Sequence, residues 1–179
     1  MRIALEDLFF VKTKYACAVI LLGLFFSACG YRFSGGGSLP AGITSISVEM
    51  FENRTGETGV ENIITNDFIY EFTRHEQVVV TGSDRADAIF SGVVQSISER
   101  AISHTGDYTS NERRVKLKVD LQLTDKSGEV IWSAKNVSEK EAYQVLSDKQ
   151  STERNKRDAI ETLSKRLAEN IFNRLTAGF

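Results

Sequence analysis

Residues 114–124 read Arg-Val-Lys-Leu-Lys-Val-Asp-Leu-Gln-Leu-Thr, with apolar and polar side chains alternating along the stretch. Successive side chains of a β-strand point to opposite faces of the sheet, so this stretch predicts a strand with one buried and one solvated face. Such a strand is typical of an antiparallel sheet that is covered on one side only. Residues 125–128 (Asp-Lys-Ser-Gly) then predict a hairpin turn, and residues 130–143 predict the returning strand, bulged where its alternation is imperfect.

The segments at the start of the domain predict a strand followed by a helix. Residues 43–51 are rich in apolar side chains and predict the first strand, and residues 52–56 have the composition of a turn. A helix is expected over residues 60–75, with a capping box from Thr58 to Glu61 at its start. The apolar stripe of this helix repeats every four residues and consists of Val60, Ile64, Phe68 and Phe72, with Ile63 beside it.

Two further segments lie between this helix and the alternating strand. Residues 77–80 predict a short extended piece, and a longer strand is expected from Ala88 onward, with Ile89, Val93 and Ile97 on one face. Residues 107–111 are polar and predict a loop.

The chain closes with a long amphipathic segment, residues 152–176, which predicts the second helix. Its core stripe consists of Ile160, Leu163, Leu167, Ile171 and Leu175, with Phe172 adjoining. The expected order is therefore β-α-β-β-β-α. This order predicts an α+β two-layer sandwich, in which two helices cover one face of a mainly antiparallel four-stranded sheet. The other face of that sheet has no helix left to cover it.

The N-terminal region has the pattern of a bacterial signal peptide. Basic residues precede an apolar run at 16–26, which is too short to cross a hydrocarbon core of about 30 Å. The run leads into Phe26-Ser27-Ala28-Cys29-Gly30, which resembles a lipobox, where a diacylglyceryl group is attached to the cysteine thiol and the peptide is cut before it. The alternative is that Cys29 is an ordinary buried cysteine at the end of a signal peptide. We expect a signal peptide at 1–28, a lipidated flexible tether at 29–42 and a single domain at 43–179.

The composition excludes several classes of function. With 22 basic and 24 acidic residues, the chain is not a polybasic nucleic-acid binder. The two Cys and two His, at positions 17, 29, 75 and 104, do not have the spacing of a zinc finger or an iron–sulfur cluster. No nucleophile elbow or metalloprotease motif is present, and His75 and His104 are better explained as surface residues than as general bases. We therefore expect no catalytic residues, no cofactor and no metal.

One group of charged residues stands out from the background. Arg113, Arg114, Lys116 and Lys118 lie at the start of the alternating strand, and the last three share its polar face by their period of two. Like charges at this density suit a polyanionic partner such as a phosphorylated lipid. The alternative is an ordinary solvated face whose cations are neutralised by the neighbouring acids Glu112 and Asp120.

The chain as a whole resembles the LptE family of lipopolysaccharide-assembly lipoproteins. The resemblance spans residues 29–179 and includes the β-α-β-β-β-α order and the closing amphipathic helix. The motifs that carry it are Cys29-Gly30-Tyr31-Arg32-Phe33, Ile46-Ser47-Val48, Phe51-Glu52-Asn53-Arg54-Thr55, Ala86-Asp87-Ala88-Ile89-Phe90-Ser91-Gly92 and Gly128-Glu129-Val130-Ile131-Trp132. None of these motifs is specific alone, whereas their combination is.

This resemblance implies a function and a location. It implies a non-enzymatic lipoprotein, anchored through Cys29 at the periplasmic face of the outer membrane, that plugs an LptD-like β-barrel and assists lipopolysaccharide assembly. It also implies that the protein binds lipopolysaccharide, for which Arg114, Lys116 and Lys118, and more weakly Arg113, are the candidate ligands. The principal alternative is a lipoprotein that activates a cell-wall synthase or builds a secretion pore. A ligand carrier without a barrel partner is a third hypothesis.

Overall fold

The computed structural model describes residues 39–76, 78–102 and 112–177. Their elements, in chain order, are the 3₁₀ helix η1 (Pro40–Gly42), β1 (Ser45–Val48), β2 (Glu52–Asn53), α2 (Val60–Thr73), β3 (Val79–Val80), β4 (Ala88–Ala101), β5 (Glu112–Asp125), β6 (Val130–Gln144) and α3 (Lys149–Ala177). The expected signal peptide, Cys29, most of the expected tether, His104 and the expected loop at 107–111 lie outside the described residues.

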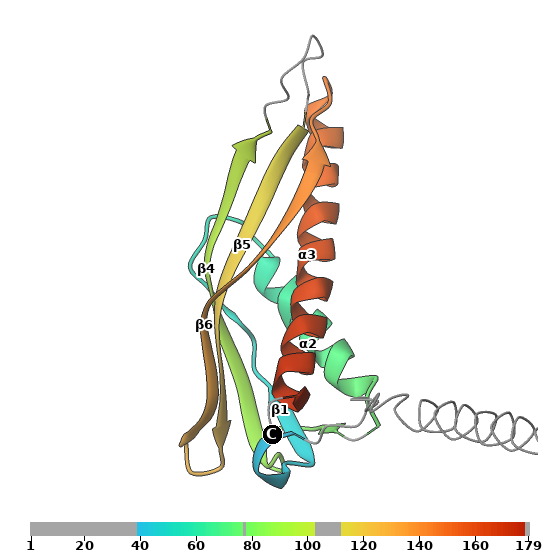
Figure 1. Ribbon diagram of the computed structural model, residues 1–179. Coiled ribbons are helices and arrows are strands. Elements are labelled where there is room, and N and C mark those ends of the chain that lie inside the picture. The colour runs from blue at the N-terminus through green and yellow to red at the C-terminus, as the bar shows by residue number, and fades with distance from the viewer. Residues whose placement is uncertain (1–38, 77, 103–111, 178–179) are drawn as a thin grey trace, which may run out of the picture. The chain divides into compact units, whose positions relative to one another are not determined.

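Both helices lie on one face of the sheet, which confirms the two-layer α+β class (Figure 1). The two predicted helices and the alternating strand all form, with bounds that differ by up to three residues from those expected. Although α3 has 29 residues, no helix in the described ranges is both long and apolar enough to cross a membrane. Leu39 is buried in the core and residues 40–42 form η1, so ordered structure begins within the segment that was expected to be tether.

The sheet is mixed rather than mainly antiparallel, and the expectation of four strands is wrong. Its order is β3-β1-β4-β5-β6, and β2 pairs separately with β4. The β1–β3, β1–β4 and β2–β4 pairs are parallel, whereas β4–β5 and β5–β6 are antiparallel. Parallel neighbours need a crossover connection, which α2 provides between β1 and β4. The residues expected as a turn at 52–53 form β2, and neither β2 nor β3 is long enough to show an alternating pattern.

The core lies between the sheet and the two helices. The predicted stripes of α2 and α3 and the apolar face of β5 are all buried in it. Four aromatic rings form its centre: Phe68 lies 5.3 Å from Phe51 and 4.9 Å from Phe90, and Phe72 lies 5.3 Å from Phe90, between ring centroids. Trp132 is half-buried and packs against this core. These ring contacts pack α2 against β4 and against the connection between β1 and β2.

The start of α2 differs from the expected capping box. Gly59, not Thr58, is the N-cap residue; it has φ 88° and forms no side-chain cap hydrogen bond. Instead, Asn53 donates through Nδ2 to Glu61 Oε2 at 2.7 Å and to the Glu57 carbonyl oxygen at 2.9 Å. The polar contacts at the start of the helix therefore come from Asn53 in β2. A capping box relates residues only three positions apart, so that motif does not predict this contact.

The side chains of β4 face differently from the prediction. Phe90 and Val94 are fully buried, whereas Ile89 and Val93 lie on the opposite face, so placing Ile89 and Val93 together with Ile97 was wrong. The register with β5 shifts between Val94 and Ser96, which leaves Gln95 as an extra residue in a β-bulge. Because a bulge interrupts the period of two, Ile97 lies on the core side of the sheet although Val93 does not.

Candidate anion-binding groove

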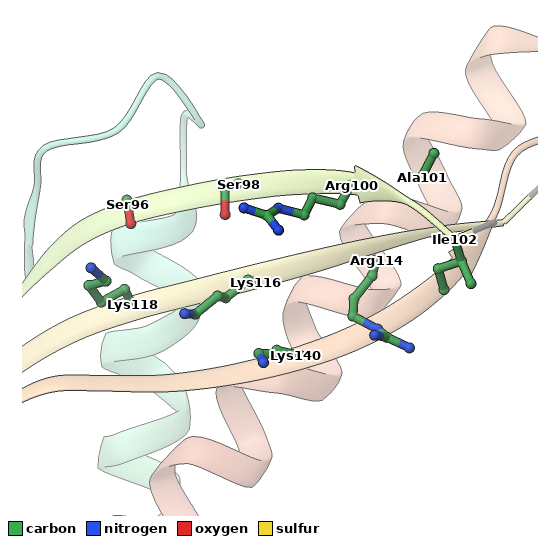
Figure 2. A pocket seen from close by; sticks show the side chains of 9 residues that line it. All are labelled: Ser96, Ser98, Arg100, Ala101, Ile102, Arg114, Lys116, Lys118 and Lys140. Atoms are coloured by element: carbon green, nitrogen blue, oxygen red, sulfur yellow. The ribbon is translucent and has the colours of Figure 1, made fainter.

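A groove of about 560 Å³ lies on the sheet face that the helices leave uncovered (Figure 2). It extends across β4, β5 and β6 at the end of the sheet where β4 finishes and β5 begins. Five of its lining residues are cations: Arg100, Arg114, Lys116, Lys118 and Lys140. Its other lining residues are Ser96, Ser98, Ala101 and Ile102.

The strand register places these cations directly opposite one another. Arg100 on β4 is paired with Arg114 on β5, and Lys116 on β5 is paired with Lys140 on β6. Lys118 follows on the same face of β5, about 14 Å from Arg114 at about 3.4 Å per strand residue. Like charges directly opposite each other destabilise a sheet, so this arrangement costs folding free energy unless an anion occupies the face.

Asp120, one of the two neighbouring acids, is hydrogen-bonded to groups that do not line the groove. Asp120 accepts hydrogen bonds from Gln95 Nε2 at 2.8 Å and from the backbone N–H of Asn136 at 2.6 Å. Within the described ranges, none of the five groove cations forms an ion pair. Asp120 therefore forms no direct ion pair with these cations in the described part of the chain, and their neutralisation by Glu112 stays a hypothesis.

The chemistry of the groove suits a phosphorylated ligand. Guanidinium groups bind phosphate through two parallel N–H donors, and ammonium groups bind it as compact point charges. Ser96 and Ser98 line the same groove with hydroxyl groups that can donate to phosphate oxygens. Ala101 and Ile102 add apolar surface beside Arg100 and Arg114 (Figure 2). An amphiphile with phosphorylated head groups matches this combination.

The structure separates Arg113 from the other three predicted cations. Arg114, Lys116 and Lys118 line the groove, as their period of two predicts. Arg113 has the opposite parity, and its Nη1 atom lies 3.8 Å from Glu99 Oε2 on the helix side of the sheet. Its contribution to a ligand site on the open face would therefore require the side chain to leave this carboxylate.

Sequence reasoning missed two of the groove cations, Arg100 and Lys140. Without the bulge at Gln95, strict alternation from Phe90 and Val94 would turn Arg100 toward the core. Lys140 lies on β6 beyond a second register shift, where the alternation is broken. Both residues are visible as cations in the sequence, but the face on which these two lie depends on how the strands pair.

His75, which was expected to be a surface residue, packs against neighbouring side chains. His75 stacks on Phe172 with 3.7 Å between ring centroids, and its Nε2 atom lies 3.2 Å from Glu71 Oε1. The side chain is therefore partly covered rather than a free surface group. Among the described residues, no three His, Cys, Asp or Glu side chains are grouped so that they could hold a metal ion.

Two helices on one face of a mixed sheet, with a cationic groove on the uncovered face, define a two-layer α+β domain with one open, charged face. Within this class, the chain belongs to the LptE family, described as lipopolysaccharide-assembly, whose family model matches residues 43–175. The curated proteins contain no significant match to the sequence.

Two solved lipoprotein structures share the fold at low sequence identity. Lipoprotein B from Nitrosomonas europaea is 16% identical, with a TM-score of 0.56 over 83% of this chain and 92% of that chain. A minor lipoprotein from Acinetobacter baumannii is 17% identical, with a TM-score of 0.51 over 75% of this chain and 91% of that chain. At these identities the similarity shows a common fold.

Proposed function

We propose that this protein is a non-enzymatic outer-membrane lipoprotein that partners and plugs an LptD-type β-barrel and assists lipopolysaccharide assembly. In this proposal Cys29 carries the lipid anchor at the periplasmic face of the membrane, and residues beyond it connect the anchor to the folded domain. The groove on the open sheet face binds the phosphate groups of lipopolysaccharide. Membership of the LptE family supports the role in lipopolysaccharide assembly.

The observation that carries the ligand proposal is the pairing of like charges across the strands. Arg100 opposite Arg114 and Lys116 opposite Lys140 concentrate positive charge on a face that no helix covers. On a face that only contacts water, such pairs destabilise the sheet. A polyanion bound between the paired cations would form charge-assisted hydrogen bonds with both and offset their repulsion. The uncovered polar face also suits the lumen of a β-barrel, whose interior is polar.

A double charge reversal tests ligand binding. We expect the Lys116→Glu, Lys118→Glu variant to bind purified lipopolysaccharide about tenfold or more weakly than the unmodified lipoprotein, because hydrogen bonds to charged groups contribute about 1.5–3 kcal/mol each. Affinity of the unmodified protein should also fall as salt rises. The matched control is Lys149→Glu, Lys165→Glu, which makes the same charge change at exposed positions on α3. Equal affinities for all three proteins would refute the ligand site.

The barrel partner is tested by recovery of the intact complex. The tagged lipoprotein is purified from detergent-solubilised outer membranes and washed at high salt, and the retained proteins are identified. A stable complex with a large β-barrel supports the proposal. Recovery of a cell-wall synthase or a secretion pore in its place would favour the alternative class of lipoprotein.

A further inference from the structure

A network of ionised side chains lies on the helix side of the sheet, at the end that carries the groove on its other face. At its centre, Lys156 of α3 places Nζ 2.6 Å from Glu57 Oε2 and 3.0 Å from Glu99 Oε1, and its side chain is only 13% exposed. The second oxygen of Glu99 accepts a hydrogen bond from the Tyr143 hydroxyl and faces Arg113. The network thus joins α3, the segment before α2, and all three strands of the groove.

The protonation states of this network favour the observed contacts. Burial lowers the pKa of Lys156, but its hydrogen bonds and ion pairs with Glu57 and Glu99 raise it by more, so the ammonium stays charged. Burial raises the pKa of Glu99, whereas the Tyr143 hydroxyl, Lys156 and Arg113 lower it, and the net pKa lies below its usual value. At neutral pH both partners are therefore ionised, and the Lys156–Glu99 pair is intact.

The final part of β4 depends on few other contacts. β1 and β2 pair with β4 only between Ala88 and Val94, so from Gln95 onward this strand is an edge strand paired with β5 alone. That same segment carries Arg100 directly opposite Arg114. Electrostatic repulsion between these guanidinium groups acts to separate the end of β4 from β5. Glu99, the residue before Arg100, is held from the helix layer by Lys156.

We infer that Lys156 is a positioning residue for the groove: by holding Glu99, it keeps Arg100 opposite Arg114 and preserves the cationic pair that phosphate binds. This inference rests on the proposed function of the groove. Lys156 contacts no ligand in this scheme, because it lies on the other side of the sheet from the groove. It acts through the backbone of β4, and its effect on binding requires Arg100.

A double-mutant cycle with the purified lipoprotein tests this inference, with lipopolysaccharide as the probe. We expect Lys156→Met and Arg100→Gln each to weaken binding about tenfold or more, of the order of one hydrogen bond to a charged group. The double variant should bind no more weakly than Arg100→Gln alone, because both changes remove the same contact. Lys156→Arg should restore most of the affinity. Lys165→Met is the matched control, since Lys165 is an exposed lysine on the same helix.

Hydrogen exchange separates positioning from general destabilisation. In Lys156→Met, amide exchange should accelerate within residues 95–101 and stay unchanged in the centre of β5. The positioning role would be overturned if exchange accelerated throughout the domain. It would also be overturned if the affinity of the double variant fell by the product of the two single reductions. If Lys116→Glu, Lys118→Glu abolishes binding while Lys156→Met binds normally, the positioning role is wrong and the groove stands. If the unmodified lipoprotein does not bind, or Lys116→Glu, Lys118→Glu leaves its binding unchanged, the proposed ligand site is wrong and the inference that rests on it is overturned with it.

Discussion

Gly92→Ala tests whether the aromatic core leaves any room beside β4. A Cβ atom at Gly92 would lie 2.8 Å from both Cδ1 and Cζ of Phe51 and closer still to Cε1. Phe51 has little freedom to move, because it is 2% exposed and stacks on Phe68 at 5.3 Å between ring centroids. Its backbone N–H also donates to Thr65 Oγ1 at 3.1 Å. The position therefore requires glycine for space.

The expected loss of stability is the difference between two opposing effects. Alanine in a strand is favoured over glycine by about 0.5–1 kcal/mol, because glycine loses more conformational freedom on folding. Overpacking a well-filled core costs about 1–3 kcal/mol. We therefore expect Gly92→Ala to lower the free energy of unfolding by about 1–2 kcal/mol. Phe51→Leu alone should cost about 1–2 kcal/mol, less than the 3–5 kcal/mol typical of Phe→Ala.

The assay is equilibrium unfolding in urea, with both single variants and the double variant. Because leucine vacates the space of the ring edge, the double variant should be more stable than the sum of the single losses by about 1 kcal/mol or more. Gly56→Ala is the control, since a Cβ atom there meets nothing within 4 Å, and it should change stability by less than about 0.5 kcal/mol. Gly92→Ala as stable as the unmodified protein, or strictly additive losses, would refute the argument.

Two further substitutions test the side-chain hydrogen bonds that connect the segments around β1 to the start of β4 and to α2. Asp87 Oδ2 accepts hydrogen bonds from Ser45 Oγ at 2.7 Å and Thr44 Oγ1 at 3.1 Å, and with Lys126 these donors hold its pKa well below the usual range. The carboxylate therefore stabilises the fold above the unfolded-state pKa of about 3.9, and that stability is lost as pH falls toward the folded-state pKa. Urea unfolding at several pH values should show that Asp87→Asn is less stable than the unmodified protein at neutral pH. The difference between their free energies of unfolding should narrow below about pH 4. A difference that does not change with pH would contradict this prediction. Thr65→Val should cost about 1–3 kcal/mol in the same assay, because it leaves the buried N–H of Phe51 without its acceptor, and an unchanged urea midpoint would show that this hydrogen bond is dispensable.

The sequence by itself determined the parts of the fold that bury one continuous face. Val60, Ile64, Phe68 and Phe72 recur at helical spacing, and the apolar residues of β5 recur at strand spacing. Each pattern lies within one element, so local periodicity predicts both its type and its buried side. The same reasoning placed Arg114, Lys116 and Lys118 together on the open face, where the structure has them.

Only the tertiary structure decided which strands pair and in what register. The two-residue strand β2 exists only because β4 supplies its hydrogen bonds, so no local pattern predicts it. An extended piece was expected at 77–80, where β3 forms, but its parallel pairing with β1 was not. The bulge at Gln95 places Arg100 in the groove, and the register of β6 brings in Lys140. A bulge is a mismatch between two paired strands, and the side chain it turns outward cannot be assigned from either strand alone.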